Sequence, residues 1–384
     1  MYRVSSCLPR LRFRGLPYRL VRIPREGCFI VAKIFCDGSE AIARGAILAG
    51  LRFYAGYPMA PSSDLLDQLR SKLPEAGGVC INAESEIAGA NMALGAAISG
   101  ARAATGSTGQ GVALMQETIA ECALHETPIV IFTISRMQQD YFQSTRGGGW
   151  GDYRTICMAP KDVGEAFALT QWLFHLADKY RMPAILLADG MLARTQVSVD
   201  LTPLAFESLP VKDWALDGTG TGTRNSKTYW TWNEGKVNHP GPGPQVHWSN
   251  LAAKFDNVAA VEARWEGVCV EDADVLIVAF GTAAKFVEYV VREMRAEGHK
   301  VGLFRPVTLW PFPYEALEAA ASSVRAIGVF ELNAGQMIDD VRISIPNRHA
   351  IRAIGGISTD RSGLGIGELL DAPVVRARIE ELMI

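Results

Sequence analysis

At residues 128–134 the chain reads PIVIFTI. This run is apolar and rich in β-branched residues, which is typical of a strand buried on both faces of a parallel sheet. From Ile34 onward, short apolar stretches of this kind alternate with longer helical ones, such as the helix predicted over 163–180 and the strand predicted over 184–188. The alternation predicts an α/β protein in which helices cover parallel sheets.

The length of 384 residues suits two compact domains. We expect two doubly wound domains over 31–205 and 263–384, because a second series of strands begins near Asp274. Residues 206–262 are expected to connect them. Within this connection, residues 212–250 are rich in Gly, Thr, Pro and Asn and show neither a helical nor a strand period.

Residues 1–30 differ in composition from the rest of the chain. They hold seven arginines and a single glutamate, whereas the whole chain has a net charge of -3. We expect this basic extension to lie outside the fold. An Arg-rich leader is also typical of an organellar transit peptide, but we favour Val31 as the natural start.

The composition excludes several classes of partner. Hydrophobic residues make up 48% of the chain and charged residues 21%, which indicates a buried interior and no basic surface for nucleic acid or anionic membranes. Apolar runs such as 128–134 are too short to cross a bilayer. The seven cysteines stand singly, so we expect no metal or cluster site on this chain and a cytoplasmic location.

Four stretches resemble the 2-oxoacid:ferredoxin oxidoreductases. They are GYPMAPSS at 56–63, ESEIA at 84–88, GHKVGLFRPVTLWPFP at 298–313 and ELNAGQM at 331–337. The resemblance extends from about Ile34 to near the end of the chain. It implies a pyrimidine-binding domain for thiamine diphosphate, followed by a domain like the C-terminal domain of transketolase.

The resemblance assigns the central catalytic role to Glu86. It aligns with the glutamate that hydrogen-bonds the aminopyrimidine ring of thiamine diphosphate and favours the imino tautomer, which deprotonates the thiazolium carbon. Such a carboxyl group needs apolar surroundings, and the small residues between 88 and 97 would let a helix pack closely around it. The alternative is that Glu84 and Glu86 are first-turn acids that stabilise a helix dipole, a far commoner role for glutamates in general, and the motif alone favours the catalytic reading.

Other residues of the cofactor site follow from the same resemblance. Thr108, Gly109 and Gly111 match the turn beside the pyrimidine ring, where a helix N-terminus offers free amide donors. Tyr57 is also assigned to cofactor binding. A tight turn from strand to helix with no ligand is the alternative reading of this segment.

Substrate binding is assigned to Arg136, Pro58 and Ala60. Arg136 matches the arginine that binds the carboxylate of the 2-oxoacid, since a guanidinium offers two parallel donors to a carboxylate. The alternative is an arginine at a strand end that pairs with a surface acid. The family loop commonly reads Tyr-Pro-Ile-Thr-Pro, and Ala60 stands where the threonine hydroxyl would contact the substrate.

A glycine-rich segment, GGGWGD at 147–152, resembles the mobile loop over the substrate in the same family. Its candidate residues are Gly148, Gly149 and Asp152, because glycines allow close backbone approach and unusual dihedral angles. A plain connecting loop is the alternative.

The chain lacks the Gly-Asp-Gly motif that binds the diphosphate and magnesium in this family. The resemblance therefore implies partner subunits: a thiamine-diphosphate-binding beta subunit that carries Mg²⁺, a gamma subunit, and a ferredoxin-like subunit with iron–sulfur clusters. Coenzyme A would be the acyl acceptor and ferredoxin the electron acceptor.

The segment YFQSTR at 141–146 looks most like the branched-chain group of the family, whose representative substrate is 3-methyl-2-oxobutanoate. A 2-oxoglutarate enzyme is the runner-up and would need a second cation, for which Arg146 and Arg154 are candidates. Two other readings stay open: the β subunit of a lipoamide-linked 2-oxoacid dehydrogenase, and a scaffold subunit that has lost its chemistry, as Ala60 would allow.

Overall fold

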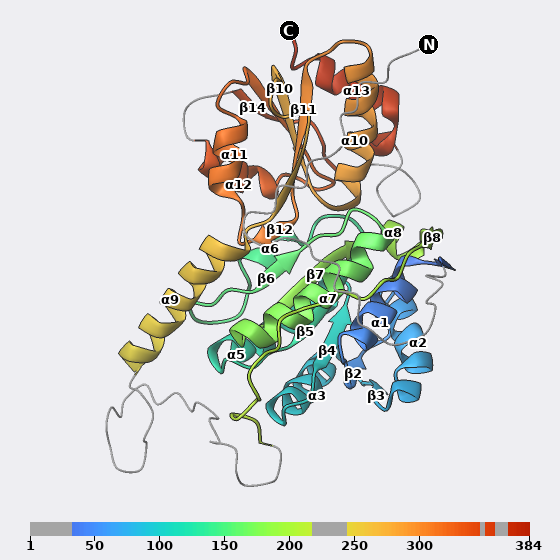
Figure 1. Ribbon diagram of the computed structural model, residues 1–384, viewed down its shortest axis with the longest axis vertical. Coiled ribbons are helices and arrows are strands. Elements are labelled where there is room, and N and C mark those ends of the chain that lie inside the picture. Colours follow the sequence, from blue (N-terminus) through green and yellow to red (C-terminus); the bar gives the residue numbers. More distant parts are fainter. Residues whose placement is uncertain (1–32, 217–243, 346–349, 358–367) are drawn as a thin grey trace.

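The computed structural model describes residues 33–216, 244–345, 350–357 and 368–384. They form two α/β units, each a sheet with its covering helices, which we call the first and the second layer. The two layers are stacked along the long axis of the molecule, the first coloured blue to green and the second orange to red (Figure 1). The basic extension 1–30 and residues 217–243 of the expected connection lie outside the described residues.

The first layer is built on a seven-stranded sheet with the strand order β12-β6-β7-β5-β4-β2-β3. The strands are β2 (Phe53–Gly56), β3 (Val79–Asn82), β4 (Ala103–Ser107), β5 (Val130–Ser135), β6 (Ile156–Met158), β7 (Ala184–Asp189) and β12 (Thr308–Trp310). All pairings are parallel except that of β12 with β6. PIVIFTI supplies β5, which is buried throughout between β4 and β7, as the sequence predicts.

Helices cover both faces of this sheet (Figure 1). Successive residues of β5 point to opposite faces, so Phe132 packs with α1, α2 and α7 while Ile131 packs with α3 and α5. The elements around the sheet are α1 (Gly38–Leu48), α2 (Ser63–Lys72), η1 (Pro74–Ala76), α3 (Glu86–Ile98), α4 (Gly109–Leu114), α5 (Gln116–Leu124), α6 (Tyr141–Thr145), α7 (Val163–Tyr180) and α8 (Gly190–Arg194). From the sequence, one helix is predicted to run from the turn at 106–111 to about Leu124; the structure divides it at Met115 into α4 and α5.

The second layer contains a five-stranded sheet with the order β14-β13-β10-β11-β9, in which only β9 is antiparallel. Its elements are β9 (Trp265–Val268), β10 (Val275–Ala279), α10 (Gly281–Ala296), β11 (Val301–Pro306), α11 (Tyr314–Ala320), β13 (Ala326–Phe330), α12 (Met337–Ser344), β14 (Ala350–Ala353), η2 (Glu368–Leu370) and α13 (Ala372–Glu380). A small antiparallel ribbon of β1 (Ile34–Cys36) and β8 (Val197–Val199) lies apart from both sheets.

The connection between the layers contains a long helix, α9 (Pro244–Glu262). Residues 244–250 were expected to lack helical structure, and this expectation is wrong. The helix buries His247, Leu251 and Val258, which share one helical face. This face is narrow and begins with a polar histidine, so the sequence shows no clear apolar period here.

Two features bind the layers together. The strand β12 belongs by sequence to the second layer but extends the first sheet. In addition, the buried guanidinium of Arg305 on β11 donates to Glu165 on α7 over 2.6 Å and to Glu266 on β9 over 2.9 Å. Lys161, at the start of the loop before α7, also bonds Glu266 over 2.7 Å.

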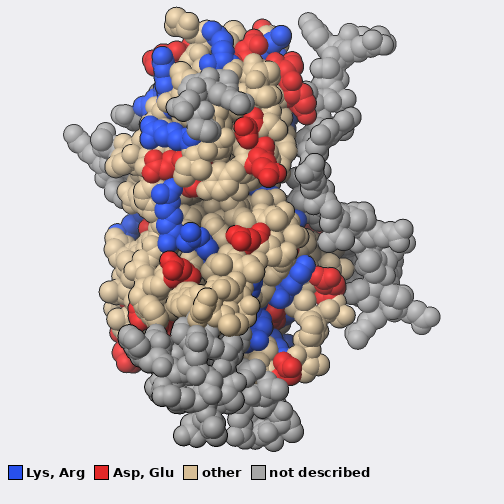
Figure 2. Space-filling model, turned by 90° about the vertical axis from the view of Figure 1, so that its left-hand side faces the viewer, with Lys and Arg blue, Asp and Glu red and all other residues tan. Residues whose placement is uncertain are grey.

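The described surface agrees with the small net charge of the chain. On the face shown in Figure 2, Lys and Arg side chains are interspersed with Asp and Glu side chains. None of the helices in the described ranges is both long and apolar enough to cross a bilayer.

Replacing Arg305 by Met should lower the free energy of unfolding by about 3–5 kcal/mol, because Glu165 would lose its cation and the buried Glu266 would keep only Lys161. Denaturant titration of the variant measures this change. Arg70→Met is the matched control, since Arg70 and Asp67 are both well exposed and their ion pair should contribute little. Equal effects of the two substitutions would contradict this role of Arg305.

Candidate active site

The candidate residues gather at the carboxyl edge of the first sheet. The chain passes from β2 to β3 on one side and then returns to β4 on the other side of β2, so the direction of strand addition reverses between β2 and β4. Ligands of open α/β sheets bind outside the carboxyl ends of the strands at such a switch point. The loop 57–62 follows β2 and the turn 107–111 follows β4 at this place.

Glu86 is the first residue of α3, the helix that follows β3 at this switch point. Ser85 caps the helix by accepting from the amide of Ala88, and this fixes the backbone that carries Glu86. The Glu86 side chain is 4% exposed, and its Oε1 accepts from the hydroxyl of Ser107 over 3.1 Å. Across the residues that the structure describes, no hydrogen bond reaches its Oε2.

Gly111 provides the space that this carboxylate occupies. A Cβ added at Gly111 would lie 2.4 Å from Oε1 of Glu86 and 2.1 Å from Oγ of Ser107. Real Cβ atoms do not come so close to other atoms. Position 111 therefore requires glycine as long as Glu86 and Ser107 keep these places. The structure thus brings Glu86, Ser107 and Gly111 together, as the sequence predicts for Glu86 and the turn.

The turn also contacts the loop after β2. The buried Thr108 hydroxyl approaches Sδ of Met59 at 3.7 Å and donates to Oε1 of Gln110 over 2.9 Å. On either side of Met59, Tyr57, Pro58 and Ala60 are exposed in the loop after β2. They are therefore open to a ligand or to another protein chain.

Arg136 stands immediately after β5 and is exposed. The carboxylate near it is Asp140, which accepts from the hydroxyl of Ser135 and, over 2.7 Å, from Gln143. Burial, the largest influence, raises the pKa of Asp140 above its ordinary value, while these two hydrogen bonds and Arg136 act to lower it. Within the described residues Arg136 forms no ion pair closer than 4 Å, so its guanidinium remains available.

Asp140 joins the loop of Arg136 to the turn at 107–111. A Cβ on Gly109 would lie only 2.1 Å from Oδ1 of Asp140, and Gln143 donates to the carbonyl of Gly109 over 3.0 Å. Ser107, Asp140 and Gln143 were not selected from the sequence. Asp140 lies four residues after the candidate Arg136, but nothing local shows that it contacts Gly109.

The glycine-rich segment 147–152 packs against α5. The hydroxyl of Tyr153 accepts from the amides of Gly148 and Gly149 over 3.0 Å each and donates to Gln116 on α5. Trp150 donates to Glu121 over 2.8 Å. Asp152 is exposed, and within the described parts of the chain no hydrogen bond or ion pair of this segment reaches Glu86 or Arg136.

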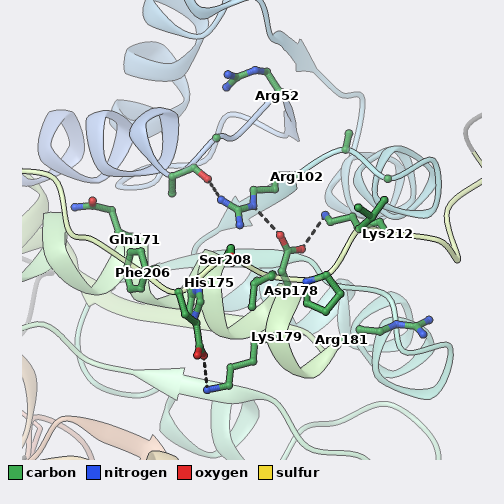
Figure 3. A pocket seen from close by; sticks show the side chains of 18 of the residues that line it. Arg52, Arg102, Gln171, His175, Asp178, Lys179, Arg181, Phe206, Ser208 and Lys212 are labelled. Carbon is green, nitrogen blue, oxygen red and sulfur yellow. Dashed lines mark hydrogen bonds and ion pairs between the residues drawn. The ribbon is translucent and has the colours of Figure 1, made fainter. Parts of the chain in front are cut away.

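A separate cavity of about 800 Å³ lies at the opposite, amino edge of the sheet. Figure 3 shows Arg102 and Lys212 both directed at Asp178 within it, and His175 beside Phe206. Its charged groups are thus largely paired with one another. This cavity is distinct from the candidate site, which is an open edge rather than a closed pocket.

The fold defines the class of protein. The chain superposes on a split-gene transketolase, an inactive beta4 tetramer, with a TM-score of 0.58 over 91% of this chain and 98% of that chain. At 13% identity this is a likeness of fold alone. A second structure, a 2-oxoglutarate:ferredoxin oxidoreductase from Magnetococcus marinus with 2-oxoglutarate, coenzyme A and succinyl-CoA bound, gives a TM-score of 0.77 at 26% identity, covering 92% of this chain and 66% of that chain. The class is that of the thiamine-diphosphate enzymes with a transketolase-like fold.

Two family models match the two layers. "Pyruvate flavodoxin/ferredoxin oxidoreductase, thiamine diP-bdg" covers residues 44–219, and "Pyruvate:ferredoxin oxidoreductase core domain II" covers 273–362.

Relatives in Methanothermobacter marburgensis include a ketoisovalerate oxidoreductase subunit VorB, 36% identical over 80% of this chain and 88% of the relative. A 2-oxoglutarate synthase subunit KorA from the same organism is 32% identical over 80% and 90%. The chain belongs to the 2-oxoacid:ferredoxin oxidoreductases, as an alpha-type subunit of an oxidoreductase with an iron–sulfur acceptor. This family assignment sets aside the lipoamide-linked alternative.

Gly111→Ala should displace both Glu86 and Ser107, lower stability by about 1–3 kcal/mol through overpacking, and remove most of the activity. Thermal unfolding and turnover of the assembled enzyme measure the two effects. Gly95→Ala in α3 is the matched control, because a Cβ there meets nothing within 4 Å. It should leave stability unchanged or slightly higher. An active, fully stable Gly111→Ala variant would argue against the packing described for Glu86.

Proposed function

We propose that this chain supplies the pyrimidine half of a thiamine-diphosphate site. The enzyme would convert 3-methyl-2-oxobutanoate and coenzyme A to the acyl-CoA with reduction of ferredoxin. The observation that carries the proposal is the buried carboxylate of Glu86, held by Ser107 through Oε1 and with Oε2 uncommitted at the switch point of the sheet. A carboxyl group so placed can keep a hydrogen bond to a ring nitrogen that water does not replace.

The residues around Glu86 fit the cofactor. Gly111 leaves room for the Glu86 carboxylate beside Ser107, and Thr108 and Gly109 begin the helix next to it. When bound, thiamine diphosphate would supply a thiazolium carbon that adds to the 2-oxoacid and accepts its electrons on decarboxylation. Glu86 would hold the proton at the pyrimidine nitrogen, and Arg136 would orient the substrate carboxylate with two parallel donors.

Exposed apolar side chains on the two helices next to Glu86 and its turn support a site shared with another subunit. Ile87 and Met92 on α3 and Leu114 on α4 are each more than a third exposed. Exposed large apolar side chains on neighbouring helices are typical of protein interfaces. We propose that a beta subunit carrying the diphosphate and Mg²⁺ covers them, and that gamma and ferredoxin-like subunits complete the enzyme with its iron–sulfur clusters.

The contacts that Arg146 makes favour the branched-chain substrate over 2-oxoglutarate, because they engage a side chain that would be needed as the second cation. Its guanidinium lies over the ring of Phe142 at 4.5 Å and bonds Asp340 over 3.4 Å. Arg154, the other candidate for a second cation, donates to the carbonyl of Tyr153. Ala60 offers no hydroxyl, so carboxylate binding would depend mainly on Arg136, which suits a substrate with a single carboxylate.

Glu86→Gln should reduce turnover of the assembled enzyme by about 10²–10⁴-fold, because the amide retains the shape but cannot hold the proton. The thermal unfolding temperature should stay unchanged. Glu84→Gln is the matched control: Glu84 is exposed two residues earlier, and its substitution should have no effect. Unchanged turnover in Glu86→Gln would rule out the assigned role.

Dye reduction by the chain co-expressed with its neighbouring subunits tests the substrate. With thiamine diphosphate and coenzyme A supplied, kcat/KM for 3-methyl-2-oxobutanoate should exceed that for pyruvate by at least about tenfold, since each extra methyl group that fits a pocket favours binding of the transition state. Preference for 2-oxoglutarate would keep the mechanism and replace the substrate. No turnover in an intact, cofactor-loaded complex would favour the scaffold reading.

A further inference from the structure

Arg136 is anchored on its two sides by different layers of the molecule. Ser135, immediately before it, is the last residue of β5 and pairs with Asp189 in the first sheet. Gln138, two residues after it, is 3% exposed and, among the described residues, forms its hydrogen bonds with the second layer alone. The backbone that carries the guanidinium therefore bridges the boundary between the layers.

All four polar groups of Gln138 are engaged there. The side-chain Oε1 accepts from the amide of Leu332 over 2.9 Å, and Nε2 donates to the carbonyl of Phe280 over 2.8 Å. The Gln138 amide donates to the carbonyl of Leu332 over 3.3 Å, and the Gln138 carbonyl accepts from Nδ2 of Asn333 over 2.8 Å. A buried residue with every polar group bonded has little freedom to shift.

A second set of hydrogen bonds to the same segment comes from Gln336, three residues after Asn333 in the second layer. Gln336 donates from Nε2 to the carbonyl of Gln139 over 2.7 Å and accepts at Oε1 from the amide of Phe142 over 2.8 Å. Gln336 itself is fixed because the carboxylate of Glu331 accepts hydrogen bonds from the backbone amide of Gln336 and from the first two amides of α12. Asn333 and Gln336 thus hold both halves of the segment 138–142, and we call this pair the clamp.

We propose that the clamp is a positioning device for the 2-oxoacid: it sets the place of Arg136 and so couples the second layer to recognition of the substrate carboxylate. This inference rests on the proposed role of Arg136. Neither clamp residue needs to touch the substrate. The clamp lies within ELNAGQM, the motif at 331–337 that has no other function in the site described above.

A double-mutant cycle on the assembled enzyme tests the clamp. Asn333→Ala should raise KM for the 2-oxoacid about tenfold, as expected when a binding group is misplaced by a fraction of an ångström, with a smaller change in kcat and none in KM for coenzyme A. Arg136→Met should raise the same KM. In the Arg136→Met background, Asn333→Ala should add nothing further, because the group that it positions is gone.

Gln171→Ala is the matched control. Gln171 is also a buried amide with two backbone partners, Leu204 and Phe167, but it lies on α7 at the other edge of the sheet. It should cost similar stability and leave both KM values unchanged. If Asn333→Ala prevents folding, Gln336→Met provides the same test, since Gln336 is only half-buried.

The possible outcomes separate the two proposals. An equal rise in KM caused by Asn333→Ala with and without Arg136 would overturn the clamp but not the role of Arg136. So would an unchanged KM in both clamp variants. If Arg136→Met alone left KM for the 2-oxoacid unaltered, the proposed role of Arg136 would fail and the clamp with it.

Discussion

The buried guanidinium of Arg305 is the contact on which the relative placement of the two layers depends. Its charge is out of water, so it is stable only where Glu165 of the first layer and Glu266 of the second meet it at once. Apolar packing alone is non-directional and would tolerate small rotations of one layer over the other. A buried arginine shared between two carboxylates tolerates them much less, because its donors have a fixed planar geometry.

The same stretch of chain continues this connection. Immediately after Arg305 and Pro306, residues 308–310 leave the second sheet and join the first as β12. The path from β11 to β12 therefore ties both sheets within a few residues. The motif GHKVGLFRPVTLWPFP, which in sequence only suggested a family, has a structural explanation here: it contains the ion-pairing arginine and the crossing strand.

The sequence was sufficient for the elements whose periods are long and regular. PIVIFTI predicts β5, and α7 spans 163–180 as expected, because eighteen helical residues show several turns of apolar spacing. Strands of three residues, such as β6 and β12, contain too few positions to show a period. Glu86 was located by its motif, yet its contacts with Ser107 and Gly111 depend on strand order. The bond between Gln138 and Leu332 joins residues 194 positions apart, and no local pattern carries such information.

If Arg136 binds the substrate carboxylate as proposed, the missing hydroxyl at Ala60 and the rigidity around Arg136 are physically connected. Where a threonine and an arginine both contact a carboxylate, either can compensate for a small displacement of the other. With Ala60 in that place, orientation of the carboxylate would fall to one guanidinium on a flexible side chain. The entropy cost of holding such a side chain is lower if its backbone is already fixed. In this chain β5 fixes it on one side and Gln138 on the other, and the second of these anchors depends on the relative placement of the layers, to which Arg305 contributes.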